Sequence, residues 1–548
     1  MASHLFCFSA KGLQSYIMRG GKLRDMTGAT SLIDKLSTES ELEKWFTTGF
    51  GISKTAFEIL QSAAGSARIK FSDDVSAFHI TRFWPLWCHQ WAPGLEVVQH
   101  LEPWEQGEGY AKVAARAAKA LETKRNFPMV QLPEVGPFVK RAPRTGEPAV
   151  LYDHAKEEWI DLATARKRDE RNSLKKQISS IEKTFGFTSE TQIPHDFSDV
   201  AGKAYLAIVH ADGNRLGQMF LEVGQAMENG VKDEIAIPLF KYLSHEVVAE
   251  GTREAVRITM AELAKDWGNS KWPLVPLVLA GDDVTVVCRA DVGLPFAETF
   301  LKEFRKEMET RLGAECLKKQ PWWKDVPKNV QEKIPKALSA GAGIVFCTNH
   351  YPFSLAYELC EDVAKQAKNC AKKILENDHS RVVPPSALSF VRISGATAPK
   401  NFSDLERGIL RGSDNSILTG CPYFLDSNDA PQYADLLEVY KLTRPAPTEG
   451  RGFLPSTSLR DLLKLQRTEA EKVQEAVERI KEVAGGNDKK ASDQKKAWNT
   501  WEKAWKKLCG IENSDWQHLR FHRSPHGERD EKDSPLLDLL TLLAIQKD

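Results

Sequence analysis

The stretch Leu277 to Val287, which reads LVLAGDDVTVV, decides how this chain of 548 residues is interpreted. Two β-prone runs flank a small-residue turn, and that turn carries two adjacent carboxylates, Asp282 and Asp283. Gly281 permits a tight turn, because glycine reaches backbone angles that other residues avoid. The stretch therefore predicts a β-hairpin with one carboxylate on each side of its tip.

A second apolar run, Ala204 to Ala211, ends on a third carboxylate, Asp212. Palm-type nucleotidyltransferases hold a pair of Mg²⁺ ions with Asp residues at two strand ends. Each ion takes one or two protein carboxylates, and two ions about 3.5–4 Å apart activate an attacking 3′-hydroxyl and stabilise the leaving pyrophosphate. The pattern predicts a nucleotide-polymerising or nucleotide-cyclising enzyme, with Asp212, Asp282 and Asp283 as catalytic and metal-binding residues.

Phosphate binding is predicted for the segment that follows Asp212. Residues 213–217 read GNRLG and are expected to form a loop that opens a helix, whose first backbone N–H groups would cradle phosphates. The predicted nucleotide-binding residues are Gly213, Asn214, Gly217, Gly281, Lys365, Lys368 and Lys372. The three lysines share one face of a helix predicted from Leu355 to Lys373, and an exposed basic face explains that spacing equally well. For the hairpin, the simpler alternative is a polar tip without a function.

These motifs resemble those of the large subunit of type III CRISPR effector complexes, the polymerase/cyclase that makes cyclic oligoadenylates. That family carries a Gly-Gly-Asp-Asp hairpin, and here Ala280 replaces the first glycine. Its ADGD segment is matched by residues 211–214, with Asn214 in place of the second acid. The resemblance implies ATP as substrate, two Mg²⁺ or Mn²⁺ ions, a cyclic oligoadenylate product and an antiviral signalling role. It also implies guide RNA, target RNA and other effector subunits as partners.

The N-terminal segment resembles the first palm domain of the same family. The matching residues are Phe6 to Ile17 and Lys22 to Ala29, and a hairpin is expected between Phe57 and Phe71. Residues 64–67 of that hairpin, AGSA, stand where AGDD stands in the other, and Ser9 falls near the position of Asp212. We interpret this region as a palm without metal ligands that shapes a composite nucleotide pocket. An unrelated α/β domain is the alternative.

The predicted fold class is α+β, with two ferredoxin-like palm domains, helical insertions and a C-terminal helical bundle. The predicted domains are residues 1–105 (first palm), 106–200 (helical linker), 201–435 (second palm) and 445–548 (helical domain). A charged helix is expected from His154 to Phe185. The alternating charges of Arg166 to Arg171 favour a solvated face over an RNA contact. Trp498, Trp501 and Trp505 share one helix face and predict core packing.

Composition limits the classes of protein to which the chain could belong. Lys and Arg total 75, and Asp and Glu total 75, so no overall basic field indicates tight nucleic-acid binding by the chain alone. The nine cysteines form no C-x-x-C pair, so we expect no zinc site and a reducing, cytoplasmic location. No apolar run approaches the roughly 20 residues that span a bilayer, so no membrane association is expected.

Other functions remain open from the sequence. A cyclic-dinucleotide synthase or a linear polymerase would use the same three carboxylates. A scaffold subunit of a CRISPR ribonucleoprotein, with RNA bound and a vestigial palm site, is the non-enzymatic alternative. Retention of all three Asp residues argues against the scaffold, because the first palm shows a site without carboxylates in the same chain.

Overall fold

The computed structural model describes residues 3–63, 65–127, 136–174, 179–201, 205–228, 230–268, 270–378, 381–394, 399–427, 431–444, 454–485, 490–510 and 534–545. Helices and strands mix along the chain, so the predicted α+β class is confirmed. The strands form a four-stranded sheet, a six-stranded sheet and a two-stranded hairpin.

The smaller sheet has the strand order β2-β3-β1-β4 and is antiparallel throughout. Its strands are β1 (Ser3–Lys11), β2 (Phe57–Ala63), β3 (Ser66–Phe71) and β4 (Glu96–Trp104). Helix α2 (Leu23–Leu36) joins β1 to β2, and α4 (Asp74–Trp91) joins β3 to β4. This β-α-β-β-α-β succession is that of the ferredoxin-like motif. The predicted first hairpin, Phe57 to Phe71, is therefore confirmed.

The larger sheet has the order β12-β11-β10-β7-β9-β8. Its strands are β7 (Leu206–Gly213), β8 (Leu274–Ala280), β9 (Asp283–Arg289), β10 (Ala340–Cys347), β11 (Ala387–Arg392) and β12 (Tyr423–Phe424). Within it, β10-β7-β9-β8 repeats the order β4-β1-β3-β2 of the smaller sheet. The two sheets thus share one topology, and β11 and β12 extend the second.

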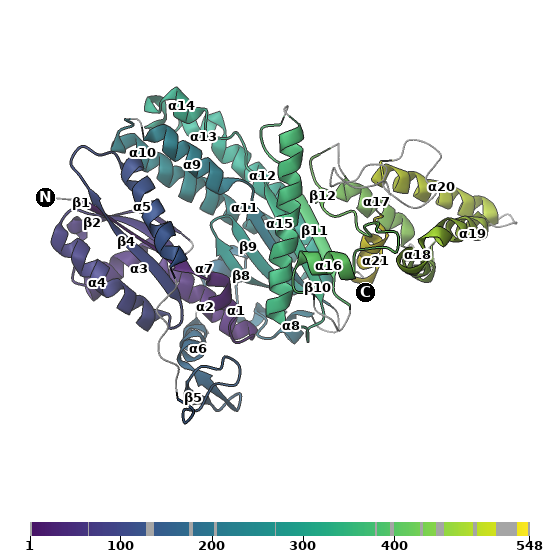
Figure 1. Ribbon diagram of the computed structural model, residues 1–548, viewed down its shortest axis with the longest axis horizontal. Coiled ribbons are helices and arrows are strands. Elements are labelled where there is room, and N and C mark those ends of the chain that lie inside the picture. The colour runs from purple at the N-terminus through teal and green to yellow at the C-terminus, as the bar shows by residue number, and fades with distance from the viewer. Residues whose placement is uncertain are drawn as a thin grey trace. The chain divides into compact units, whose positions relative to one another are not determined.

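Helices connect the strands of both sheets (Figure 1). Those before β7 are α1 (Leu13–Met18), α3 (Glu39–Lys44), α5 (Tyr110–Asn126), α6 (Leu162–Leu174), α7 (Ser180–Thr184) and α8 (Phe197–Ala201). Between β7 and β10 lie α9 (Leu216–Met227), α10 (Asp233–Lys241), α11 (Glu250–Leu263), α12 (Ala290–Leu312), α13 (Ala314–Lys318) and α14 (Lys328–Gln331). A π-helical stretch, Tyr242–Ala249, joins α10 to α11. The predicted helix start after Gly213 is confirmed, because α9 begins at Leu216.

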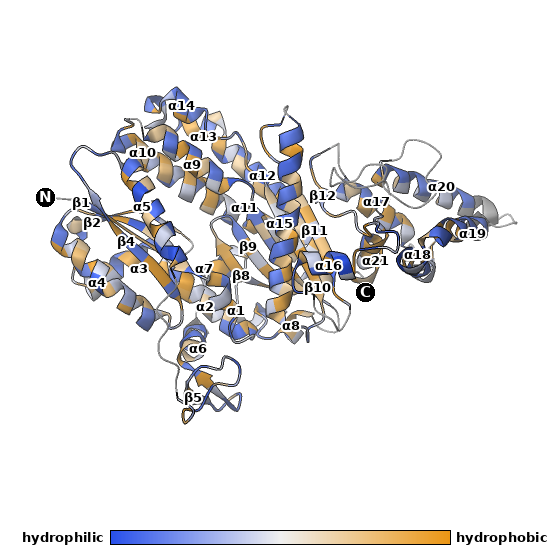
Figure 2. Cartoon of the chain, viewed as in Figure 1, coloured by the Kyte–Doolittle hydropathy of each residue, from blue (hydrophilic) through white to orange (hydrophobic). Residues whose placement is uncertain are grey.

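The centre of the larger sheet is apolar on both faces. All eight residues of β10 are buried, and Figure 2 shows the strand in hydrophobic colours. Helix α15 (Phe353–Asn377) packs directly on β10, and a Cβ on Gly343 would lie 2.4 Å from the Cys360 carbonyl oxygen. Glycine is therefore required there for the helix and the strand to approach so closely.

The C-terminal helices are α16 (Phe402–Gly408), α17 (Tyr433–Thr443), α18 (Ser456–Thr468), α19 (Val473–Gly485), α20 (Lys490–Leu508) and α21 (Leu536–Ile545). Trp498, Trp501 and Trp505 are buried, and the Trp501 Nε1 donates to Thr443 Oγ1 at 2.9 Å. The prediction that these tryptophans form core is confirmed. The run Gly485-Gly486-Asn487 predicts a helix end, and residues 486–487 of it lie outside the described residues.

The prediction of one charged helix from His154 to Phe185 is wrong. The segment opens with a β-hairpin, β5 (Ala149–Asp153) and β6 (Glu158–Asp161), and α6 starts only at Leu162. The solvated face predicted for Arg166 to Arg171 is also wrong, because four of these six side chains are buried. They are Lys167, Arg168, Glu170 and Arg171, and all have charged or carbonyl partners.

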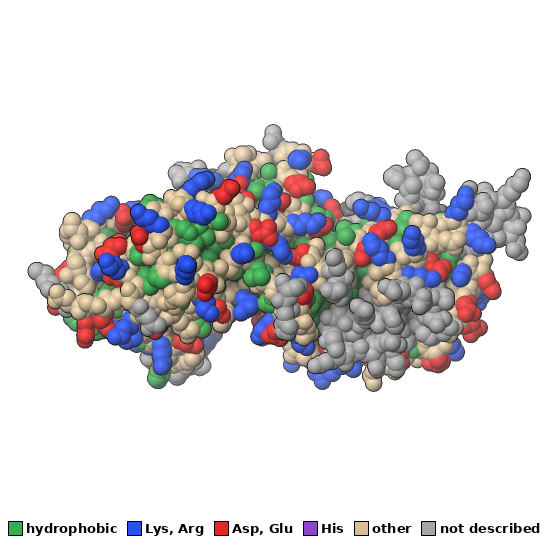
Figure 3. Space-filling model, turned by 90° about the horizontal axis from the view of Figure 1, so that it is seen from above, with side chains coloured by type: hydrophobic (Ala, Val, Ile, Leu, Met, Phe, Trp, Pro, Cys, Tyr) green, Lys and Arg blue, Asp and Glu red, His purple; other side chains and the backbone are tan. Residues whose placement is uncertain are grey.

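The chain divides into two compact units. One comprises Met1–Val200, Arg215–Val286 and Glu303–Leu338, and the other Ala201–Asn214, Val287–Lys302 and Ser339–Asp548. The four predicted domain boundaries stay predictions. On the face that Figure 3 shows, Lys and Arg side chains alternate with Asp and Glu. Among the described residues, no helix is long and apolar enough to cross a membrane.

Candidate functional site

The β8–β9 hairpin places two of the three predicted carboxylates. Its two-residue turn is Gly281-Asp282, and Asp283 is the first residue of β9. Gly281 has φ 66°, a left-handed conformation that favours glycine, so the predicted role of Gly281 in the turn is confirmed. The turn and both strands up to Val286 belong to the first compact unit.

A cavity of about 460 Å³ opens beside this hairpin, within the same unit. Gly281 and Asp283 line it, together with four residues of β8 that form one wall (Leu277, Val278, Leu279 and Ala280). Other lining residues come from the smaller-sheet region, namely Thr30, Ile33 and Asp34 of α2 and Ser62 and Ala63 of β2. Figure 1 shows α2 and α7 close to β8.

Charged and polar side chains of the cavity come from separate parts of the chain. Asp34, Glu39, His245 and Arg253 line it, and Glu39 forms an ion pair with Lys241 at 3.2 Å. Sequence reasoning missed these residues. They sit on α2, α3, the π-helical stretch and α11, and no motif in the sequence links those four positions. The cavity lining thus combines apolar residues of β8 with acidic, basic and hydroxyl groups, a mixture typical of small-molecule sites.

The third carboxylate, Asp212, lies at the end of β7 in the other compact unit. Lys368 of α15 forms an ion pair with its Oδ2. Gly341 of β10 is the register partner of Asp212, and a Cβ on Gly341 would lie 2.6 Å from the Lys368 Cγ. A side chain at position 341 would occupy the space of the Lys368 side chain, so glycine at this position allows Lys368 to reach Asp212. Both side chains are partly exposed, at 26% and 37%.

A buried histidine lies on the same strand, two residues before Asp212. His210 is only 7% exposed, and desolvation lowers its pKa, opposed by the negative charges of Glu361 and Asp212. Its ring makes an edge contact with Tyr357 of α15. The imidazole is therefore held neutral at physiological pH, and it adds no positive charge beside Asp212.

Asn214, predicted to bind phosphate, is buried and engaged with the protein. Its backbone N–H donates to the Ser339 carbonyl oxygen at 2.8 Å, and its Nδ2 donates to Ser339 Oγ at 2.9 Å. Ser339 Oγ in turn donates to the Pro384 carbonyl oxygen. These bonds fix the end of β7 against the start of β10. In this structure the backbone N–H and the side-chain amide of Asn214 therefore stabilise the fold.

The remaining predicted binders belong to β7, α9 and α15. Gly213 ends β7, whereas Gly217 is the second residue of α9 and has open space around its Cα. Lys365 and Lys372 are exposed on α15, and Lys372 pairs with Glu376 one turn further along the same helix. Of the three predicted lysines, the structure brings Lys368 to a predicted carboxylate. Binding of nucleotide by these residues stays a prediction.

The donor chemistry of the hairpin suits a hard divalent cation. Within the part of the chain that the structure describes, no three His, Cys, Asp or Glu side chains gather into a metal site. Mg²⁺ does not require such a cluster, since one or two carboxylates commonly hold it together with water and substrate phosphates. Asp282 and Asp283 are adjacent carboxylates of that type, and Asp283 lines the cavity.

Known proteins resemble this chain in fold and not detectably in sequence. No protein-family model matches it, and no curated protein sequence matches it. The fold is similar to a crystal structure of the Csm1–Csm4 cassette in complex with pppApA, with a TM-score of 0.48 and 12% identity over 92% of this chain and 69% of that one. It is similar to Csm1 in T. onnurineus, with a TM-score of 0.46 and 13% identity over the same shares. A Csm1–Csm4 cassette in complex with cA4 gives a TM-score of 0.46 and 11% identity, over 92% of this chain and 70% of that one.

Proposed function

We propose that this protein is a metal-dependent nucleotidyltransferase that joins or cyclises nucleoside triphosphates. The observation that carries the proposal is the cavity of about 460 Å³ beside the β8–β9 hairpin, with Asp283 and Gly281 in its wall. Small-molecule and cofactor sites typically have about 300–1,000 Å³ and a few polar groups in an apolar lining. The cavity fits that size and lining, and it stands next to the adjacent carboxylates that triphosphate chemistry needs.

The residues of the chain have distinct roles in this proposal. Asp212, Asp282 and Asp283 hold two Mg²⁺ or Mn²⁺ ions, which when bound supply charge neutralisation and activation of the 3′-hydroxyl. The β8 wall receives the nucleoside, and the carboxylate of Asp34 in α2 orients it. Lys368 holds Asp212 and offers a positive charge to the phosphates. Positioning carries most of the catalysis, so the protein needs no nucleophile of its own.

The sequence resemblance to the type III CRISPR large subunit supports ATP as substrate and cyclic oligoadenylate as product. It also supports guide RNA, target RNA and effector subunits as partners in antiviral defence. A cyclic dinucleotide would arise from the same carboxylates. The scaffold alternative differs from both of these enzymatic functions, because a protein with a vestigial site would form no product at the hairpin.

The test is mass spectrometry of products formed by the purified full chain. Each nucleoside triphosphate is incubated singly and in mixtures with Mg²⁺ or Mn²⁺, with and without target RNA and partner subunits. An Asp282→Asn/Asp283→Asn variant, which keeps side-chain volume, is the control. A cyclic product that is absent from the control establishes the activity and names the base. Identical product profiles for the two proteins under every condition would overturn the proposal.

A further inference from the structure

Helix α2 lies between two parts of its own compact unit, and it contacts both through buried groups. On one side, Thr30 Oγ1 donates to the backbone carbonyl oxygen of Leu277 in β8 at 2.5 Å. On the other side, Ser31 Oγ donates to Glu170 Oε1 of α6 at 2.8 Å. Both α2 residues are buried, at 7% and 6% exposure. The helix therefore joins α6 to the strand that leads into the Gly281-Asp282 turn.

The contact with β8 matters because β8 is the outermost strand of its sheet. An outermost strand has one backbone edge without a strand partner, and proteins commonly cover such an edge with a helix. Thr30 also lies 3.0 Å from the Met26 carbonyl oxygen of its own helix, but a hydroxyl has a single proton to donate. The shorter contact, to Leu277, ties α2 to the edge strand four residues before Gly281.

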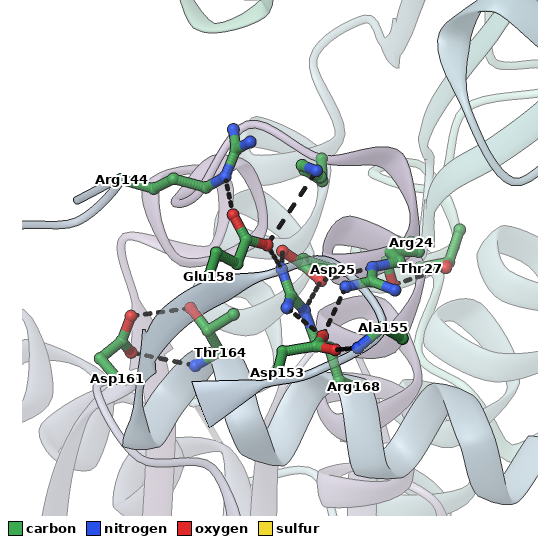
Figure 4. A network of polar contacts seen from close by, with 11 residues as sticks. Arg24, Asp25, Thr27, Arg144, Asp153, Ala155, Glu158, Asp161, Thr164 and Arg168 are labelled. Atoms are coloured by element: carbon green, nitrogen blue, oxygen red, sulfur yellow. Dashed lines mark hydrogen bonds and ion pairs between the residues drawn. The ribbon is translucent and has the colours of Figure 1, made fainter. Parts of the chain in front are cut away.

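Helix α6 holds α2 from the opposite side through charge and close packing. Arg168 places two guanidinium nitrogens on the carboxylate of Asp25, at 2.9 and 3.2 Å, and it also bonds Asp153 and Glu158 (Figure 4). A Cβ on Gly28 would lie 2.1 Å from the Lys167 carbonyl oxygen, so α2 and α6 cross at backbone contact. Lys167 Nζ donates to the Tyr16 carbonyl oxygen at 2.5 Å, just before α2.

We propose that Thr30 is a positioning residue, which fixes the β8–β9 hairpin through the Leu277 carbonyl while the Arg168 ion network holds α2 in place. Thr30 acts through the backbone of β8, which carries the turn and hence the carboxylates of Asp282 and Asp283. For its catalytic meaning this inference rests on the proposed function. The mechanical claim, that α2 restrains β8, concerns the protein without any nucleotide.

The test compares variants of the full chain by amide hydrogen exchange in the absence of nucleotide. Thr30→Val keeps shape and removes the hydroxyl, and Thr30→Ser keeps the hydroxyl. The matched control is Thr259→Val, because Thr259 is also a buried helix residue and its hydroxyl donates to the Ala255 carbonyl oxygen of its own helix. We expect exchange across residues 274–283 to rise about tenfold in Thr30→Val, the size of a lost buried hydrogen bond. Thr30→Ser should restore wild-type exchange.

Equal exchange of residues 274–283 in Thr30→Val and Thr259→Val would overturn the proposal. This readout separates positioning from ligand contact, since a residue that merely touched nucleotide would not change exchange in the free protein. If Thr30→Val does not fold, Ser31→Ala probes the same connection from α6. Faster exchange in both α2 and β8 supports the connection, and faster exchange confined to α2 contradicts it.

Product assays then connect the restraint to chemistry. If the wild type makes product, Thr30→Val should lower kcat about tenfold, the rate equivalent of the same free energy, and Thr30→Ser should recover it. A Thr30→Val enzyme with faster exchange and an unchanged kcat would overturn the link to catalysis. Absence of product from the wild type would count against the proposed function, and the exchange data would still decide whether Thr30 restrains β8.

Discussion

The two sheets of this protein share a strand order, but their hairpins carry different chemistry. In the smaller sheet the turn after β2 has Gly65 at φ 72°, and Ser66 begins β3. In the larger sheet the turn after β8 has Gly281 at φ 66°, and Asp283 begins β9. Ser66 and Asp283 are each the first residue of their strand, although the alignment of AGSA with AGDD pairs Ser66 with Asp282. Both hairpins therefore have a glycine with a positive φ at the tip, whereas the carboxylates belong to one.

The strands beside the two hairpins differ in the same way. Ser9, near the end of β1, pairs in register with Ser66 and accepts a long hydrogen bond of 3.4 Å from Arg125 of α5. Asp212, near the end of β7, forms an ion pair with Lys368 of α15. In each case a helix delivers a cation to the strand end, but only Asp212 supplies an anion to meet it. The smaller sheet keeps the scaffold of the site, and Ser62 and Ala63 of its hairpin line the cavity.

The largest effect should come from giving the second hairpin the residue of the first. Asp283→Ser replaces a carboxylate at the cavity by a hydroxyl, as in Ser66. We expect the rate of product formation to fall at least about a hundredfold, the size typical of removing a group that stabilises the reacting charges. Ser66→Ala is the matched control and should leave the rate unchanged. Equal rates for Asp283→Ser and the wild type would show that the hairpins do not differ in chemistry.

The next effect concerns the packing of α2 against α6. The backbones of the two helices are in contact at Gly28. Gly28→Ala places a methyl group 2.1 Å from the Lys167 carbonyl oxygen, and the helices must separate. We expect a loss of about 2 kcal/mol in the free energy of unfolding, as for overpacked cores, measured by urea denaturation. Gly224→Ala is the control, since its Cβ would meet Phe240 at an ordinary 3.6 Å. A stabilised Gly28→Ala would contradict the close crossing of the helices.

A smaller effect should distinguish the two helix-borne cations. Lys368→Gln removes the charge that faces Asp212, and Arg125→Gln removes the charge that faces Ser9. We expect kcat/KM to fall about tenfold in Lys368→Gln, because a charge-assisted contact is lost, and to stay unchanged in Arg125→Gln. Steady-state kinetics on both variants checks this. Equal losses would mean that the two cations serve the same purpose in the two sheets.

The sequence predicts the parts of this comparison that depend on local pattern. Alternating apolar residues and a glycine at each tip are enough to predict both hairpins, and apolar periodicity predicts α15 and the C-terminal helices. The β5–β6 hairpin also had a signal, since Val150, Leu151 and Tyr152 precede a polar turn and Trp159 and Ile160 follow it. The charged stretch that follows is typical of a helix, and the predicted helix therefore began at His154 and included β6.

Tertiary burial of charge could not be predicted from the sequence. Alternating signs from Arg166 to Arg171 are typical of a solvated helix, yet a buried helix with partners on three other elements has the same sequence pattern. The partners of Arg168 and Arg171 are Asp25, Asp153 and Glu182, and these three residues are far from one another along the chain. The cavity residues Asp34, His245 and Arg253 could not be predicted either, because Asp34 is far from the other two along the chain. Only folding brings such residues together.

Buried carboxylates in the two regions give the smallest expected effect. Asp25, beside the smaller sheet, faces Arg168, whereas Asp538 of α21 is buried among neutral donors, Thr419 Oγ1, the Gly420 N–H and the Tyr423 hydroxyl. Burial raises the pKa of Asp538 to about 7, from an ordinary value near 4. The folded state therefore keeps a proton that the unfolded chain releases.

This shift fixes the sign of a pH dependence. Between about pH 4 and pH 7 this carboxyl group is ionised in the unfolded chain and protonated in the folded protein. Raising the pH through this range therefore stabilises the unfolded chain and lowers the free energy of unfolding. We expect the free energy of unfolding to drop by about 1 kcal/mol between pH 6 and 8 relative to Asp538→Asn, which mimics the neutral acid. Urea denaturation of both proteins at each pH measures the difference. Parallel pH profiles would mean that Asp538 is ionised in the folded state, and that both regions then hold a buried charge.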